Sequence, residues 1–348
     1  MTADPRWQPL AEAPNGTPAG LRVSNSDVNR FAAWAREHHD ELRAHVVQHG
    51  AVHIRGLDAG DPQRFERAVR GFTEDLKRDY LGTSPRDAVA DYVFHASELP
   101  GFYPIPQHIE MSFTNHPPTW IFFGCTIAPE RFGETPVTDF RAVARDLDAG
   151  TRTRFEHRGI KVIRNYGPPG QTNRDLWQLK PWHQMFGTTD HGAVEARCAE
   201  EGFEPTWRPD GGLRLISFHK PFQRHAETGE EVWFNHTQVF HLSAAYGEYK
   251  RIARLRPSAT TLAVAAFARL STRIKRATTA VEDHAMHATH ADGSEISSAD
   301  MENVRDAIWK NTTRVPWRVG DVLIVDNRST AHGRMPYKGP REVIVSWA

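Results

Sequence analysis

Gln107-His108-Ile109-Glu110-Met111 places two metal-binding side chains two residues apart in a segment with the character of a strand. Side chains at this spacing point to the same face of a strand, so His108 and Glu110 are expected to share one wall of a site. An imidazole and a carboxylate are two of the three ligands in the 2-His-1-carboxylate triad, which holds iron(II) and leaves positions open for substrate and dioxygen. The third ligand has to come from elsewhere in the sequence.

Three further segments follow this pair in order. Residues 119–127 are apolar and are predicted to form a buried strand, and Gly133-Glu134-Thr135-Pro136 comes shortly after them. Much later, His332 is followed by Arg334 and Arg341. An isolated H-x-E pair is weak, because 19 histidines and 43 acidic residues produce such pairs by chance, whereas the ordered set is specific.

This ordered set resembles the taurine-dioxygenase and clavaminate-synthase-like (TauD/TfdA) family of Fe(II)/2-oxoglutarate-dependent oxygenases. The likeness is strongest to members that hydroxylate amino acids in natural-product pathways, and it runs from about residue 50 to the end of the sequence. The resemblance implies a mixed β fold with peripheral helices around a double-stranded β-helix, the jelly-roll core shared with cupins. Short predicted strands with turns between them fit this architecture.

The same resemblance assigns roles to individual residues. It implies that His108, Glu110 and His332 bind Fe(II), that 2-oxoglutarate takes two of the open positions and that O2 takes the third. Related halogenases replace the carboxylate with a small residue, so Glu110 argues against halogenation. Arg341 is expected to bind the far carboxylate of 2-oxoglutarate with its guanidinium fork, and Thr135 matches the family's threonine that bonds the same group.

The spacing between His332 and the next arginines leaves an alternative open. Some relatives have a longer interval between this histidine and the arginine, so Arg334 competes with Arg341 for the cosubstrate. Arg334 otherwise forms a surface salt bridge or contacts an anionic substrate. Further candidate substrate contacts are Asn165, Asn235 and His236, weighed against satisfied polar groups at strand ends. Outside this set, His241, His284, His287 and His290 are interpreted as structural or solvated.

Composition excludes several classes of partner. Lys+Arg and Asp+Glu both total 43 in 348 residues, so the formal charge is zero and we expect neither nucleic-acid nor membrane partners. Two cysteines, Cys125 and Cys198, are too few for a disulfide framework, and Cys125 is predicted to be a small buried hydrophobe. No signal-peptide pattern or membrane-length apolar run is present, which predicts a soluble, cytoplasmic protein.

The chain is predicted to form one oxygenase domain, residues 25–348, after an irregular lead-in over residues 1–24. Helices are expected from Asp27 and from Asp61. A strand is expected over 231–241, and a helical insertion around 243–283 whose apolar face packs against the rest of the protein. Segments 77–106 and 167–189 are candidate lids over the metal site.

The expected function is hydroxylation of an unactivated carbon of an amino acid or amino-acid-derived small molecule, free or carrier-bound, in secondary metabolism, with release of succinate and CO2. One alternative keeps the cofactors and gives desaturation, cyclisation or another oxidation. Another is a non-catalytic jelly-roll protein that binds a metal or an acid, which the complete set of five expected iron and cosubstrate residues disfavours.

Overall fold

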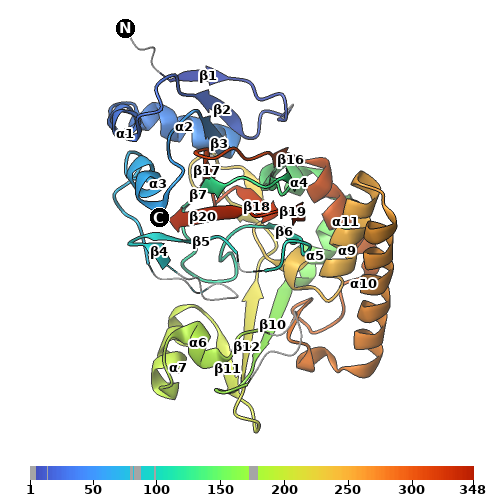
Figure 1. The fold of residues 1–348 in the computed structure, drawn as a ribbon. Helices are drawn as coiled ribbons and strands as arrows, with labels where there is room; N and C mark the ends of the chain where they lie inside the picture. Colours follow the sequence, from blue (N-terminus) through green and yellow to red (C-terminus); the bar gives the residue numbers. More distant parts are fainter. Residues whose placement is uncertain (1–4, 14, 79–80, 82–87, 98, 172–178) are drawn as a thin grey trace.

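Two β-sheets packed face to face form the centre of the fold (Figure 1). The computed structural model describes residues 5–13, 15–78, 81, 88–97, 99–171 and 179–348. The larger sheet contains, in spatial order, β1 (Arg6–Gln8), β2 (Ala19–Arg22), β3 (Ala51–Arg55), β17 (Val322–Asp326), β7 (Trp120–Ile127), β20 (Glu342–Trp347), β5 (Val93–His95) and β4 (Ala88–Ala90). The smaller sheet contains β16 (Thr312–Val315), β9 (Thr135–Asp139), β18 (Thr330–Arg334) and β6 (Ile105–His108).

The larger sheet is covered on both faces, which explains why its inner strands are largely apolar, with buried polar exceptions such as His53 and Ser346. On β7, Phe123 points into the space between the two sheets, whereas its neighbour Phe122 points outward to a layer of helices. On β17, Leu323 likewise points into the space between the sheets and Ile324 points to the helices. Side chains alternate along a strand, so a sheet covered on both sides needs apolar residues at every position. Each buried side chain of this kind contributes about 1.5–3 kcal/mol to stability.

The outer helical layer is built from the segments predicted to be helical near the start of the chain. Its members are α1 (Val28–Glu37), α2 (His39–His49) and α3 (Pro62–Val69). The Asp27 carboxylate accepts the backbone N–H of Asn29 at 2.8 Å, and the Asp61 carboxylate accepts that of Arg64 at 2.9 Å. Both aspartates therefore cap helices by binding N–H groups that lack a partner within the helix. Part of the expected irregular lead-in instead forms β1 and β2 at the edge of the large sheet.

A third sheet lies beside the central pair (Figure 1). Its strands are β11 (Glu204–Trp207), β12 (Leu213–His219), β10 (Ile160–Tyr166) and β15 (Met286–Thr289). Two short pairs complete the strands: β13 (Gln223–Arg224) with β14 (Glu231–Val232), and β8 (Arg131–Phe132) with β19 (Tyr337–Lys338). The helices are α4 (Phe140–Asp146), α5 (Ala149–Arg158), α6 (Trp182–Phe186), α7 (His191–Glu200), α8 (Thr237–Phe240), α9 (Ala244–Leu255), α10 (Ala259–Thr278) and α11 (Ser298–Lys310).

Two predictions about this half of the chain are wrong. The strand expected over residues 231–241 ends at Val232, because Asn235 accepts the backbone N–H of Thr237 at 3.0 Å and the chain enters α8 there. The apolar face expected to pack in the helical insertion is exposed on α10, where Phe267 is 72% and Leu262 58% accessible. Small side chains such as Ala268 make the contact between α10 and α9 instead. Among the described residues, no helix combines the length and apolar character needed to span a membrane.

Both thiols are expected to be inert in the folded protein. Cys125 and Cys198 are fully buried, and burial raises the pKa of their thiols to about 12 and about 11. Because the thiolate is the reactive form, we expect neither to react with a thiol reagent at about pH 8 until the protein is denatured. Counting modified cysteines by mass before and after adding urea tests this; rapid modification of the native protein would contradict it.

Candidate active site

The three predicted metal ligands meet at the edge strand of the smaller sheet. In the antiparallel pair β18–β6, His332 lies directly opposite His108, and their rings are 4.6 Å apart. The sequence had predicted that His108 and Glu110 lie on one strand. This is wrong, because β6 ends at His108 and Glu110 lies beyond it. A tight turn follows, in which Met111 has a φ of 56°, a conformation that costs a non-glycine residue about 1–2 kcal/mol. This turn brings Glu110 back to the histidines.

The geometry of these side chains fits a shared metal ion. Glu110 Oε2 lies 3.9 Å from Nε2 of His108 and 3.7 Å from Nε2 of His332, and the three ligand atoms lie within 4.8 Å of one another. Neighbouring ligands held about 2.1 Å from an octahedral metal are about 3 Å apart, so a small inward movement completes the set. His108 Nδ1 donates to the carbonyl of Pro106 at 2.8 Å, which leaves the lone pair of Nε2 available for a metal.

Asn327 holds the backbone of Glu110 from both sides. Its side-chain oxygen accepts the Glu110 N–H at 2.8 Å, and its amide nitrogen donates to the Glu110 carbonyl at 3.0 Å and to the Pro118 carbonyl at 2.8 Å. Asn327 is fully buried and lies five residues before His332. One residue therefore fixes the loop of the carboxylate ligand against the turn that leads to the distal histidine.

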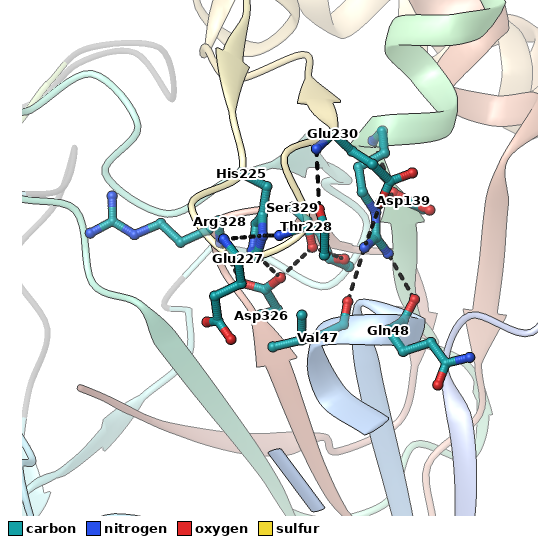
Figure 2. Close-up of polar contacts among 12 residues, drawn as sticks. Val47, Gln48, Asp139, His225, Glu227, Thr228, Glu230, Asp326, Arg328 and Ser329 are labelled. Atoms are coloured by element: carbon teal, nitrogen blue, oxygen red, sulfur yellow. Dashed lines mark hydrogen bonds and ion pairs between the residues drawn. The ribbon is translucent and has the colours of Figure 1, made fainter. Parts of the chain in front are cut away.

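A buried hydrogen-bond network also holds the turn that precedes His332 (Figure 2). Asp326 pairs with His225 Nε2 at 3.0 Å and accepts the Ser329 hydroxyl at 2.5 Å and the Arg328 N–H at 2.9 Å. His225 Nδ1 accepts the backbone N–H of Thr228 at 3.2 Å, so its Nε2 carries the proton that is donated to Asp326. The loop between β13 and β14 is thereby tied to the segment that precedes His332.

Substitution of Asn327 by alanine is expected to weaken metal binding about 10- to 100-fold, the usual loss when a group that orients a ligand is removed. Anaerobic titration with Fe(II) measures the change. Asn311→Ala is a matched control. The Asn311 side chain also donates to a backbone carbonyl, that of Ala307 at 2.9 Å, but this contact lies at the end of α11 and not at Glu110. Equal metal affinities for the two variants would show that the Asn327 contacts do not orient Glu110.

Arg341 and Thr135 lie together beside a pocket of about 450 Å³ lined by Arg334, Tyr337 and Arg341 among others. The Arg341 Nη2 is 3.5 Å from the Thr135 hydroxyl, which also accepts the indole N–H of Trp317 at 2.9 Å. Burial lowers the pKa of Arg341 to about 10, so its guanidinium is charged at neutral pH. Thr135 lies two residues before Val137, the neighbour of His332 in the sheet, so these groups are close to the predicted metal ligands.

Arg334 lines the same pocket, but its terminal nitrogens already donate hydrogen bonds to other parts of the protein. Its two terminal nitrogens donate to the Ser97 hydroxyl and to three backbone carbonyls, those of Leu99, Pro100 and Tyr103, at 2.7–3.1 Å. Arg334 therefore holds segment 97–103, part of the first candidate lid. Arg341 has Nη1 without a partner among the described residues, which favours Arg341 for binding a carboxylate. Residues 79–80, 82–87 and 98 of that candidate lid, and 172–178 of the second one, lie outside the described residues.

The expected substrate contacts separate into two groups. His236 lies next to the metal ligands, with its ring 5.2 Å from that of His108 and its Nδ1 2.9 Å from the Ser112 hydroxyl. Asn165 donates to the backbone carbonyls of residues 282 and 284 and accepts from two arginines. Asn235 joins the Pro221 carbonyl to the start of α8. The polar atoms of both asparagines thus already have protein partners.

A second group of metal-type side chains consists of His241, His287 and Glu295, with ligand atoms within 4.8 Å of one another. His287 Nδ1 accepts the backbone N–H of Leu242 at 3.1 Å, so its Nε2 carries a proton, which it donates to Glu295 at 2.8 Å. A protonated nitrogen does not bind a metal. This group is therefore a hydrogen-bonded pair with a neighbouring histidine, which supports the structural interpretation of His241 and His287.

Sequence interpretation missed Asn327, Trp317 and a buried arginine, Arg164. Asn327 had a usable signal, because an amide side chain close to a predicted ligand often orients it. Trp317 and Arg164 had none, since their importance depends on contacts with residues far away in the sequence.

Comparison with known proteins places these residues in a family. The model of the taurine catabolism dioxygenase TauD, TfdA family matches residues 9–347. The chain is 26% identical over 342 residues to dapdiamide synthesis protein DdaC of Enterobacter agglomerans, covering 97% of this chain and 92% of DdaC. It is 27% identical over 332 residues to the clavaminate synthase-like protein At3g21360 of Arabidopsis thaliana, covering 94% of this chain and 90% of that protein.

Solved structures agree on the fold. PvcB of Pseudomonas aeruginosa superposes with a TM-score of 0.52 at 13% identity, covering all of this chain and 92% of PvcB. AAD-2, solved with Mn(II) and N-oxalylglycine, gives a TM-score of 0.52 at 11% identity, covering 99% and 97% of the two chains. The two packed sheets are thus the jelly-roll core of this class, as predicted. With the family model matching almost every residue, the chain belongs to the TauD/TfdA family of dioxygenases.

Proposed function

We propose that this dioxygenase hydroxylates an unactivated carbon of an amino acid or an amino-acid-derived small molecule, free or carrier-bound, using Fe(II), 2-oxoglutarate and O2. The observation that carries the proposal is the convergence of ligand atoms of His108, Glu110 and His332 within 4.8 Å, together with a pocket lined by Arg341, whose Nη2 lies 3.5 Å from the Thr135 hydroxyl. Two imidazoles and one carboxylate are the ligand set of non-haem iron oxygenases.

Each residue has a definite task in this proposal. His108, Glu110 and His332 hold the iron, which supplies the activation of O2 and the oxidative decarboxylation of 2-oxoglutarate to succinate and CO2. Arg341 binds the far carboxylate of the cosubstrate, and the Thr135 hydroxyl, already fixed by Trp317, helps to orient it. A guanidinium suits this task because its planar fork matches a carboxylate. His236 forms part of the wall on the substrate side of His108.

The substrate class rests on relatives. DdaC is named for dapdiamide synthesis, and PvcB is described as an Fe, alpha-ketoglutarate dependent oxygenase from an isonitrile synthetic pathway. Both names refer to the synthesis of specialised small molecules, and the coverage of DdaC extends along nearly the whole chain. These relatives support a role in secondary metabolism for this protein too.

An anaerobic titration of the metal-free protein with Fe(II) and 2-oxoglutarate tests the function. We expect a visible metal-to-ligand charge-transfer band only when both are present, because the 2-oxo acid must chelate the protein-bound metal. Candidate amino acids and their derivatives are then added; a substrate is expected to shift the band and, after exposure to O2, to gain one oxygen atom by mass. Iron binding without a band would contradict the oxygenase function, and a product of unchanged oxygen content would contradict hydroxylation.

A further inference from the structure

Arg164 is a fully buried arginine in the interior of the protein. It lies on β10, is 1% exposed, and its guanidinium carbon is 4.5 Å from the ring centre of Phe113 and 4.4 Å from that of Phe203. Two aromatic rings therefore flank the guanidinium. Contacts of this kind attract a cation but supply no negative charge.

The hydrogen-bonding capacity of Arg164 is largely unused. Nη1 donates to the Tyr166 hydroxyl at 3.2 Å, whereas Nε and Nη2 are buried and have no hydrogen-bond partner among the described residues. Other deeply buried arginines differ. The side chains of Arg141 and Arg251 each donate three hydrogen bonds, and those of Arg334 donate four. A buried Nε without a partner also occurs in Arg55, Arg251, Arg305 and Arg334, but among the described residues only Arg164 has a buried terminal nitrogen, Nη2, without a partner as well.

Arg164 also has no counter-ion among the described residues, since no Asp or Glu oxygen lies within 4.0 Å of it there. Burial raises the pKa of the Tyr166 hydroxyl and raises that of the Cys198 thiol to about 11, so both are neutral at pH 7. Burial also lowers the pKa of His219 to about 4, with the Arg164 charge adding to the effect. Glu201, the buried carboxylate at the end of α7, is paired with Arg197 at 3.1 Å. A buried charge without a partner is unfavourable, so its presence requires a functional explanation.

The position of Arg164 connects it to the metal centre. Phe113 belongs to the turn that begins at Glu110, and its ring meets the ring of His236 at 5.0 Å. The His236 ring is in turn 5.2 Å from that of the ligand His108. Two ring-to-ring contacts therefore separate Phe113, which covers the guanidinium, from a metal ligand.

We propose that Arg164 binds the carboxylate of the substrate, so that this enzyme acts on a small molecule with a free anionic group near the carbon that is oxidised. This inference rests on the proposed function, because it assigns the substrate-recognition residue of the same site. The two nitrogens without partners, Nε and Nη2, form one edge of the guanidinium, which matches the two oxygens of a carboxylate. The flanking rings of Phe113 and Phe203 exclude water, which strengthens such a pair.

Formate, the smallest carboxylate, is the probe for this site. Thermal unfolding is measured on metal-free protein in sodium formate and in sodium chloride at equal ionic strength. All variants carry Arg341→Gln, which removes the carboxylate site proposed for the cosubstrate. With Arg164 intact, we expect formate to raise Tm by at least about 2 °C relative to chloride. Arg164→Met, which keeps the length and apolar stem, is expected to abolish this difference, and Arg164→Lys to retain part of it because the charge remains.

Arg251→Met is the matched control. Arg251 is also buried, but it pairs with Asp306 at 2.6 Å, so its loss is expected to lower Tm in both salts without changing the formate effect. An equal formate effect in the Arg164→Met protein, or no formate effect with Arg164 present, would overturn the inference. If Arg164→Met does not fold, the Arg164→Lys protein provides the test. An increase of Tm in formate as large as that of the protein with Arg164 would contradict binding of formate along the edge of the guanidinium.

The test is separable from that of the proposed function. Arg164→Met in the otherwise unchanged protein is expected to keep the charge-transfer band of iron and 2-oxoglutarate. If the band forms while the formate effect is insensitive to Arg164, the oxygenase function stands and only this inference fails. If the unsubstituted protein forms no band, the oxygenase function itself fails.

Discussion

Replacement of His332 by alanine is expected to abolish productive iron binding and to reduce turnover by more than about 100-fold, since removal of outer-shell partners alone typically costs 10- to 100-fold. His332 is the only one of the three ligands that comes from β18, and its Nε2 lies 3.7 Å from Glu110 Oε2. Without it, the site keeps one imidazole and one carboxylate that lie two residues apart in the chain. The measurement is the anaerobic Fe(II) and 2-oxoglutarate titration, with the charge-transfer band expected to disappear.

His287→Ala is the matched control for this substitution. His287 is as fully buried as His332 and belongs to the second histidine group, but its Nε2 donates a proton to Glu295. We expect this variant to be less stable and to keep the band. Loss of the band in His287→Ala with retention in His332→Ala would reverse the assignment of the metal centre.

Substitution of Arg341 by glutamine is expected to raise the 2-oxoglutarate concentration needed for half-maximal turnover about 30- to 900-fold while leaving Fe(II) affinity unchanged. Removing one partner of a buried, hydrogen-bonded charge pair costs about 2–4 kcal/mol. Glutamine retains hydrogen-bonding capacity but has no charge. Initial rates over a range of 2-oxoglutarate concentrations provide the measurement.

Arg334→Gln distinguishes the two arginines in the pocket. Arg334 donates four hydrogen bonds to Ser97, Leu99, Pro100 and Tyr103. Its loss is therefore expected to lower Tm, with little change in the 2-oxoglutarate concentration needed for half-maximal turnover. If the 2-oxoglutarate requirement rises in Arg334→Gln and not in Arg341→Gln, the cosubstrate carboxylate belongs to Arg334. The 2-oxoglutarate requirements of these two variants therefore identify the arginine that binds the cosubstrate.

Local chemistry made much of the fold predictable. The capping aspartates Asp27 and Asp61 marked the starts of helices because their side chains bind backbone N–H groups within a few residues. The apolar segment over 119–127 indicated a strand buried on both faces, and β7 is such a strand. The order of the metal-type residues also indicated the family before any contact was known.

Properties that depend on distant residues were not predictable. The helical periodicity of α10 showed an apolar face, but it contained no information on what covers that face, and Phe267 is exposed. The strand expected beyond Val232 was replaced by α8 because of tertiary packing and a local asparagine contact. Arg164 is the clearest case, since its lack of a counter-ion among the described residues can be recognised only from the positions of residues distant in the sequence.

The division of the proposed metal ligands between distant parts of the chain has a consequence for biosynthesis. His332 follows His108 by 224 residues, and β20, which lies between β7 and β5 in the large sheet, is made after both. Ribosomes add about 5–20 residues per second, and pairings between such distant strands form slowly. We therefore expect the nascent polypeptide to emerge with His108 and Glu110 before His332, so that no oxygen-activating centre forms before the two central sheets have assembled.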